Sequence, residues 1–469
     1  MKTFLTLSTL LLLSAPSWAH NYFSKNETCL STSDIQSVAS HFKQFQAFTA
    51  SQSGEICKGE GIDDHWFEVV RSVLALQRLN VNGAIQRDED DDLTRRPIQE
   101  KDWWGYFIER ANDFVVNPAY CSSSPGTVAF VYRFFRGQIN LCPRFFEMEA
   151  GAQIEVLMHE VRHFDGHPHV TCTQGNEAGS PGACDDTILR GGSYAVSAQV
   201  SVELAFVDQM SVEERTLSEA AATYTVNNKF NALPKVKTND YIYLANQAGE
   251  LYRALVTKLD GLELVAKLKS PAKVHGNGSQ LTIFPLDPAE RAYRTSRDLK
   301  VNVSGIGAFA NLYNAQSAEE RSLFSAVNYL GLGAIAKQDT LHAFCGKNAN
   351  GLSQHQVTAG TLKAILALMT GVKETQSILL TEAGEFLQLN CDQDTGAMST
   401  TAVELGLPTN LVAGLSFKTG EAFLLTDAGE LLRADLESRQ VSATQLPVSS
   451  WISATPIKIH SLFVESKQD

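Results

Sequence analysis

The C-terminal half of this 469-residue chain repeats one short pattern, and the repeat restricts the possible folds more than any other feature. Each clear copy has an apolar stretch, an Ala-Gly-Glu turn and a second apolar stretch. Clear copies span residues 241–253, 378–388 and 423–433, and weaker copies lie at 289–293 and 339–343. From Gly384 to Gly429 is 45 residues, and from Gly249 to Gly384 is 135, which is three times 45. Units of this length bury their apolar faces by packing against neighbouring units.

A 45-residue unit of strand, turn and strand resembles the blade of a β-propeller. About five blades fill residues 241–469, after a linker at residues 233–240. A β-solenoid or a β-sandwich is the alternative, because the middle copies are faint. The resemblance implies a binding face for a protein or cell-surface ligand.

Residues 159–169 carry four of the eleven histidines and are the second constraint. They begin with H-E-x-x-H and follow an apolar run at 154–158 that predicts a helix. Positions i and i+4 lie on one helix face, so His159 and His163 can hold one metal ion between them. The Glu160 carboxylate, about a third of a turn away, can act as a general base without binding the metal.

Gly166 suits a left-handed helix cap, and Pro168 prevents the helix from continuing, so that His169 can return as a third ligand. The segment resembles the zinc signature H-E-x-x-H-x-x-G-x-x-H of the metzincin metallopeptidases. The matching positions are His159, Glu160, His163, Gly166 and His169. The resemblance implies an α+β zincin-like catalytic domain at residues 20–232, with one zinc ion and one coordination position left for water.

Other side chains compete for the third ligand position. Glu203 lies on the next predicted helix, where glutamate-type zincins supply that ligand. Asp185 and Asp186 resemble the ligands of aspartate-type zincins. Metzincins also carry a methionine turn below the zinc, for which Met210 is the candidate, with a core methionine as the alternative. Tyr194 is a candidate donor to the oxyanion, with a packing role as the alternative.

These features predict a secreted zinc-dependent endopeptidase that acts on protein or peptide substrates. Two other classes stay open: a binding or adhesion protein with a structural metal site, and a zinc hydrolase of a non-peptide bond. The net charge of −13 argues against nucleic acid as a partner.

Elsewhere in the first half, apolar periodicity predicts five more helices and one hairpin. The helices are expected at residues 34–52, 65–79, 102–116, 193–207 and 211–230, and the hairpin at residues 127–135 with 138–141. Within the hairpin, residues 128–133 are expected to line the substrate cleft as an edge strand, with an interior hairpin as the alternative.

Residues 1–19 predict a cleavable signal peptide, with Lys2, an apolar core and a Ser-Trp-Ala cleavage site. No later stretch is long and apolar enough to span a membrane, so we expect a secreted or periplasmic protein. Eight cysteines fit disulfide formation in such a compartment. Neighbour pairing would join Cys29 to Cys57, Cys121 to Cys142, Cys172 to Cys184 and Cys345 to Cys391, although the sequence leaves the connectivity open.

Overall fold

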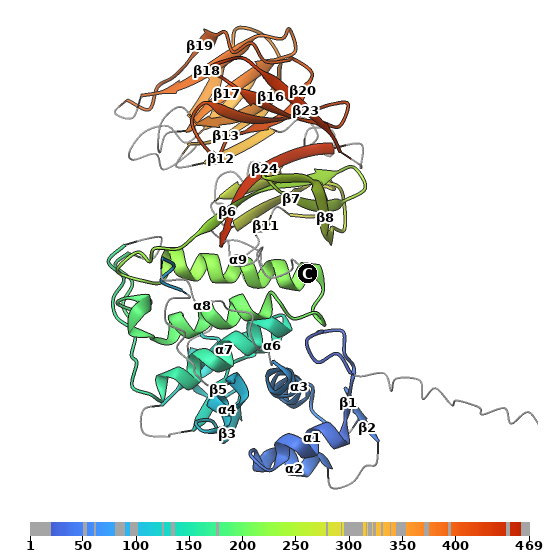
Figure 1. Cartoon of the computed structure of the whole chain (residues 1–469), viewed down its shortest axis with the longest axis vertical. Helices are drawn as coiled ribbons and strands as arrows, with labels where there is room; N and C mark the ends of the chain where they lie inside the picture. The colour runs from blue at the N-terminus through green and yellow to red at the C-terminus, as the bar shows by residue number, and fades with distance from the viewer. Residues whose placement is uncertain are drawn as a thin grey trace, which may run out of the picture.

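The computed structural model contains a helical region followed by a β-rich repeat region, which lie end to end along the long axis (Figure 1). The residues that the structure describes are 20–49, 54–60, 62–79, 90–93, 102–123, 126–132, 137–174, 178–277, 280–291, 293–294, 313–315, 317, 321, 325–329, 332–337, 339–343, 353–369, 375–392, 395–446 and 451–460. The predicted signal peptide lies outside these residues.

The helical region, residues 20–232, combines helices with two small sheets. Its helices are α1 (Thr32–Ala39), α2 (Lys43–Thr49), α3 (Asp64–Arg78), α4 (Trp103–Ile108), α5 (Tyr120–Ser123), α6 (Pro143–Glu147), α7 (Ala150–His163), α8 (Ser193–Leu204) and α9 (Val212–Asn228). Its strands are β1 (Cys29–Ser31), β2 (Glu55–Cys57), β3 (Asp113–Val116), β4 (Ala129–Val131) and β5 (Gln138–Leu141). The second sheet has the order β3-β5-β4, so β4 is an edge strand.

Two of the predicted helices differ from the structure. The segment predicted as one helix at 34–52 forms α1 and α2, separated by a turn. The segment predicted at 102–116 is helical only over α4, because its last four residues form β3 and pair in parallel with β5. These four residues include two valines, whose branched side chains favour a strand once a partner strand is present.

The core of the helical region forms where α3 and α7 pack together, with α8 covering the other side of α7. Both central helices bury apolar side chains along most of their length. The following helix α9 begins with a capping box, in which the side chains of Ser211 and Glu214 each accept a hydrogen bond from the other residue's backbone N–H. This packing fixes α7 and α8 relative to each other, and both carry residues of the candidate site.

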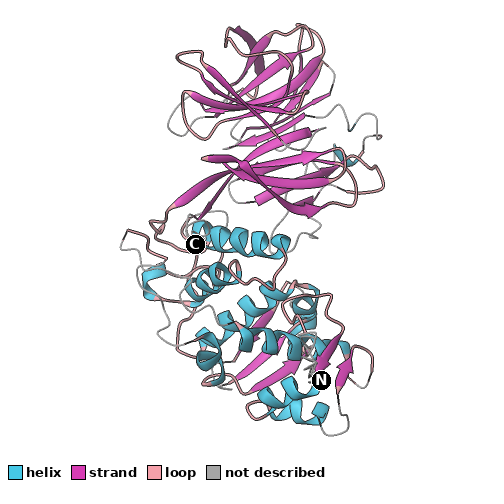
Figure 2. Ribbon diagram, turned by 45° about the vertical axis from the view of Figure 1, so that its right-hand side comes forward, coloured by secondary structure: helices cyan, strands magenta, loops and turns pink. Residues whose placement is uncertain are grey.

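The described part of the repeat region consists mainly of strands (Figure 2), which pair antiparallel except for the parallel contact between β16 and β20. They are β6 (Thr238–Asn246), β7 (Glu250–Leu255), β8 (Lys258–Lys267), β9 (Ala272–Asn277), β10 (Gln280–Pro285), β11 (Tyr293–Arg294), β12 (Ser325–Tyr329), β13 (Leu332–Lys337), β14 (Thr340–Ala343), β15 (Ser353–Gln356), β16 (Leu362–Met369), β17 (Thr375–Thr381), β18 (Phe386–Cys391), β19 (Met398–Val403), β20 (Leu411–Leu415), β21 (Glu421–Thr426), β22 (Glu430–Asp435), β23 (Val441–Gln445) and β24 (Trp451–His460). β6 begins inside the segment predicted as a linker.

Every copy of the sequence repeat coincides with an antiparallel pair of strands. The three clear copies form the hairpins β6–β7, β17–β18 and β21–β22, and the weaker copies match β10–β11 and β13–β14. Gly249, Gly384 and Gly429 each have a positive φ at the hairpin turn, where glycine carries no steric cost. The last described strand, β24, pairs with the first, β6, and so joins the two ends of the repeat region.

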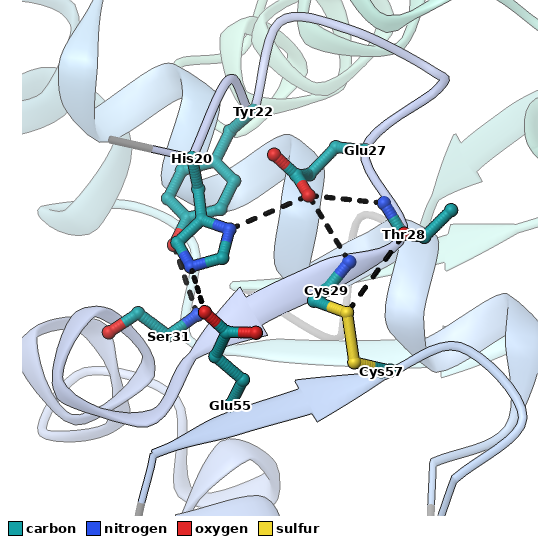
Figure 3. Close-up of a disulfide and its surroundings, with 8 residues drawn as sticks. All are labelled: His20, Tyr22, Glu27, Thr28, Cys29, Ser31, Glu55 and Cys57. Atoms are coloured by element: carbon teal, nitrogen blue, oxygen red, sulfur yellow. Dashed lines mark hydrogen bonds and ion pairs between the residues drawn. A yellow bond between two sulfur atoms is a disulfide. The ribbon is translucent and has the colours of Figure 1, made fainter. Parts of the chain in front are cut away.

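Three of the predicted disulfides are present: Cys29–Cys57, Cys121–Cys142 and Cys172–Cys184. The first links β1 to β2, beside a cluster in which Glu27 accepts hydrogen bonds from the backbone of Thr28 and Cys29 (Figure 3). Cys391 is also disulfide-bonded, whereas its predicted partner Cys345 lies outside the described residues. Disulfides of this kind fit a protein of an oxidising compartment. Among the described residues, no helix is long and apolar enough to cross a membrane.

Candidate metal centre

The last turn of α7 carries the first two histidines of the motif, as the sequence predicted. His163 is the final residue of the helix, and Gly166 follows with a φ of 84° while its N–H bonds the His163 carbonyl at 3.0 Å. The chain then reverses, so that His169 returns to the end of the helix. The ligand nitrogens of His159, His163 and His169 all lie within 4.8 Å of one another.

The outward nitrogens of the three rings face hydrogen-bond partners. His163 Nδ1 lies 2.7 Å from the His167 carbonyl oxygen, which can only accept, so Nδ1 carries the proton. His169 Nδ1 lies 3.0 Å from the Asp185 carboxylate, which fixes the same tautomer. His159 Nδ1 lies 3.0 Å from Ser197 Oγ. In this arrangement the Nε2 atoms of the three rings face the same point, where a metal ion would bind, as in other histidine metal sites.

The geometry fits a zinc ion. His159 Nε2 and His169 Nε2 are 3.0 Å apart. Two ligands of a tetrahedral zinc are separated by about 3.3 Å, given zinc–nitrogen distances of about 2.0–2.1 Å. Burial, followed by the neighbouring His169, lowers the pKa of His163 to about 4, so this ring is neutral near pH 7 and can act as a ligand.

The structure places the alternative third ligands elsewhere. The Glu203 carboxylate accepts a 2.5 Å hydrogen bond from Trp103 Nε1, and burial raises its pKa to about 7. Asp186 forms an ion pair with Arg190 at 2.5 Å on the surface. Asp185 contacts the outward nitrogen of His169, on the far side of the ring from the common point. His169 is therefore the side chain that completes the cluster.

Tyr194 lies against the histidine cluster, whereas Met210 is placed at the other end of α7. The Tyr194 ring stacks on His169 with centroids 4.5 Å apart and meets His159 edge-on at 4.8 Å. The Met210 side chain packs beside Gly151, eight residues before His159, which corresponds to about 12 Å along the helix. Met210 is thus a core residue of the helical region, as the alternative interpretation held.

Glu160 is buried, with 7% of its surface exposed, and it lines the same cleft as the histidines. Burial raises its pKa to about 8, and the nearby Glu155 adds to the shift. A cation held by the three imidazoles would favour the ionised carboxylate. The side chain can therefore exchange a proton near neutral pH.

The cleft beside the histidines has a volume of about 840 Å³ and is bordered by the edge strand β4. Residues 126–131 line one side, and Glu160, Tyr194 and the three histidines line the other. Among the strands that the structure describes, β4 pairs only with β5. An extended peptide could add to its open edge through backbone hydrogen bonds. The edge strand predicted at residues 128–133 is confirmed for residues 129–131, whereas residue 133 lies outside the described residues and substrate binding stays a prediction.

The sequence interpretation missed two serines on α8. Ser197 contacts His159, and Ser193 Oγ lies 3.1 Å from His163 Nδ1. The two serines are four residues apart on α8, as the two histidines are on α7. This matching spacing is the signal in the sequence, but it becomes visible only once α7 and α8 are known to pack together.

Asp165 supports the loop after α7. Its carboxylate accepts hydrogen bonds from Tyr106 at 2.6 Å, Arg110 at 2.9 Å and Arg162 at 2.8 Å. Arg162 also donates to the Gly191 carbonyl at 2.6 Å. This network ties the end of α7 to α4 and to the residues before α8, and so fixes the loop that returns His169 to the site.

No protein-family model matches the sequence, and no curated protein sequence matches it. Solved structures with partial similarity include YCF48 from Cyanidioschyzon merolae and apo AztD from Citrobacter koseri. YCF48 is 10% identical, with a TM-score of 0.26 over 45% of this chain and 70% of the other. AztD is 12% identical, with a TM-score of 0.25 over 46% of this chain and 83% of the other. Similarity this low carries no argument about fold or function.

Proposed function

We propose that this protein is a zinc-dependent endopeptidase that acts outside the cytoplasm. The observation that carries the proposal is the cluster of His159, His163 and His169, whose Nε2 atoms face one point beside the buried carboxylate of Glu160. Catalytic zinc sites use three protein ligands and leave one position open. The position of the cluster in a large cleft favours a catalytic role over a purely structural one.

The residues of the cleft have distinct roles in this proposal. The open edge of β4 holds the substrate backbone in an extended conformation, next to the histidines. Glu160 accepts a proton from the attacking water and returns it to the leaving amine. The Tyr194 hydroxyl donates a hydrogen bond to the carbonyl oxygen as negative charge develops there. A zinc ion at the histidines would supply Lewis-acid chemistry, by polarising the carbonyl and acidifying the water.

The second part of the proposal is that the repeat region forms a propeller of about five blades. The hairpins recur at each copy of the 45-residue repeat, and the pairing of β24 with β6 joins its two ends. In a propeller, this pairing completes one sheet from the two ends of the chain segment, and each sheet keeps only short edges. We assign this region to the binding of a protein or cell-surface ligand.

The test is a comparison of Glu160→Gln with the wild-type protein on a peptide library, with and without a chelator. Glutamine keeps the shape of the side chain but cannot accept the proton, so we expect peptide cleavage to fall by at least about 100-fold. Zinc binding should be retained, because Glu160 is not a ligand.

Glu203→Gln is the matched control, because Glu203 is a half-buried glutamate that bonds Trp103 and does not join the histidine cluster. It should keep both zinc and cleavage. If the wild-type protein binds zinc but cleaves no peptide, the endopeptidase proposal is wrong. If Glu203→Gln loses zinc, the ligand assignment is wrong.

A further inference from the structure

Asp185 connects two parts of the candidate site through its two carboxylate oxygens. Oδ1 lies 3.0 Å from His169 Nδ1, and Oδ2 accepts a hydrogen bond from the Tyr194 backbone N–H at 2.8 Å. The side chain is buried, with 4% of its surface exposed. One carboxylate therefore holds both the third imidazole and the first turn of α8.

The backbone of Asp185 is itself fixed on both sides. Its N–H bonds the Lys229 carbonyl at 2.9 Å, and its carbonyl accepts from the Asn231 N–H at 3.0 Å. The preceding residue, Cys184, forms a disulfide with Cys172. Cys184 also exchanges two backbone hydrogen bonds, of 2.7 and 3.1 Å, with the residue that follows His169. These contacts hold the backbone at Asp185 in place, so its side chain can hold His169 and the Tyr194 backbone in fixed positions.

We propose that Asp185 is a positioning residue, which places the third metal ligand and the Tyr194 ring together. The part that concerns Tyr194 rests on the proposed function, whereas the part that concerns metal affinity does not. Metal sites depend on such outer partners, and their loss weakens metal binding by about 10- to 100-fold.

The two contacts require a side chain that can accept two hydrogen bonds at once. Both neighbours donate, from His169 Nδ1 and from the Tyr194 N–H, so the supporting side chain must accept twice. Asparagine has one accepting oxygen and would present an N–H group to one of the donors. A Cβ added at Gly192 would overlap the Asp185 carboxylate. Gly192 has ordinary dihedral angles, φ −73° and ψ −170°, so alanine there disturbs the carboxylate and not the backbone.

The experiment measures the zinc affinity of Asp185→Asn and Gly192→Ala by competition with a chromophoric chelator, and the visible spectrum of each protein with cobalt. Both variants should bind zinc about 10- to 100-fold more weakly than the wild type. Both should also change the cobalt spectrum, because the His169 ring loses its fixed orientation. Gly192→Ala changes no polar group and so tests the position of the carboxylate separately from its charge.

Asp186→Asn is the matched control, because it removes the next carboxylate along the chain, which pairs with Arg190 on the surface. It should leave the zinc affinity and the cobalt spectrum unchanged. Circular dichroism of each variant verifies that the fold is intact. Zinc affinities within twofold of wild type for both Asp185→Asn and Gly192→Ala would overturn the proposal.

Peptide cleavage at saturating zinc tests the part of the proposal that concerns Tyr194 separately from the part that concerns metal affinity. Asp185→Asn should then still show a lower kcat with little change in KM, and Tyr194→Phe should add little to that loss, because both changes act through the same ring. Independent, multiplicative losses would show that Asp185 does not act through Tyr194. A protein that binds zinc in this Asp185-dependent way but cleaves nothing would refute only the endopeptidase function.

Discussion

Arg71 is a fully buried charged residue of α3, and its side chain points toward α7. Its guanidinium donates to Glu68 at 2.7 Å, to Gln153 at 2.5 Å and to the Tyr22 carbonyl at 2.9 Å. Lys58 adds a second cation at 3.2 Å from Glu68. Burial alone would raise the pKa of Glu68, but the charge and hydrogen bonds of Arg71, together with Lys58, outweigh it and lower the pKa.

A lowered pKa makes the stability of this region depend on pH. The Glu68 carboxylate contributes fully above its unfolded-state pKa of about 4.3, and the contribution is lost as the pH falls through its lower folded-state value. Glu68→Gln should decrease the free energy of unfolding by about 3 kcal/mol at pH 7, because Arg71 loses its buried partner.

Urea unfolding between pH 7 and pH 3 measures this effect. The difference between wild type and Glu68→Gln should shrink below about pH 4.3. Glu60→Gln, on the surface of the same region, is the matched control. A difference that stays constant across this range would show that the ionised carboxylate does not stabilise the fold.

The sequence predicted the residues of the site whose spacing is local, and it left open those that depend on the tertiary fold. His159, Glu160 and His163 follow from helix geometry, and His169 from the glycine that ends the helix. Asp185 was interpreted as a possible ligand, because the sequence shows the type of side chain but not which side of the His169 ring it faces.

Near the site, the segment after α7 that carries His169 has the least regular structure. Between Pro168 and Cys184 the described residues form neither a helix nor a long strand, and the Cys172–Cys184 disulfide and the short bridge between Val170 and Cys184 hold the segment in place. The disulfide therefore stabilises the position of a ligand as well as the fold.

Removal of this disulfide should weaken metal binding. The double variant Cys172→Ala/Cys184→Ala should lose about 2–4 kcal/mol of stability and bind zinc at least about 10-fold more weakly. Cys29→Ala/Cys57→Ala is the matched control: the two loops of 12 and 28 residues differ by under about 1 kcal/mol in chain entropy. Zinc titration of both proteins should show weaker binding only in the first. Equal affinities would contradict the role of this segment.

The same division between local and tertiary information holds for the elements. The hairpins of the repeat region were predicted because each needs only its own glycine turn and alternating apolar residues, as at Gly384 and Gly429. The strand β3 was predicted as helix, because its parallel partner β5 lies more than twenty residues further along the chain. A pairing of that range leaves no periodicity in a short segment.

At the scale of the whole molecule, α9 connects the helical region to the repeat region. This helix packs against β8 and β24, and it lies on the side of the helical region that faces the repeat region in Figure 1. Glu219 on α9 forms a buried ion pair with Arg253 on β7, and Arg253 also bonds Glu263 at 2.8 Å. Asp91 adds a second link, because its carboxylate accepts the backbone N–H of Lys237 at 2.9 Å. The segment predicted as a linker is therefore anchored.

Replacing either residue of the ion pair between the two regions should lower the stability of the protein, but by different amounts. Arg253→Met leaves the Glu219 carboxylate buried without this cation, and should cost about 3–5 kcal/mol. Glu219→Leu should cost less, because Arg253 keeps the half-exposed Glu263 as a partner. The double variant should recover part of the loss, since two apolar side chains of similar size replace the pair without leaving a buried charge.

Hydrogen exchange of the backbone amides in α9 and β7 measures the effect where the two regions meet. For Arg253→Met, protection in both elements should fall by at least about 100-fold, which corresponds to about 2.7 kcal/mol of local opening. Glu263→Gln, which changes only the half-exposed member, should alter protection by less than about fivefold, since exposed pairs contribute under about 1 kcal/mol. If Arg253→Met leaves α9 as protected as in the wild type, the ion pair does not couple the two regions.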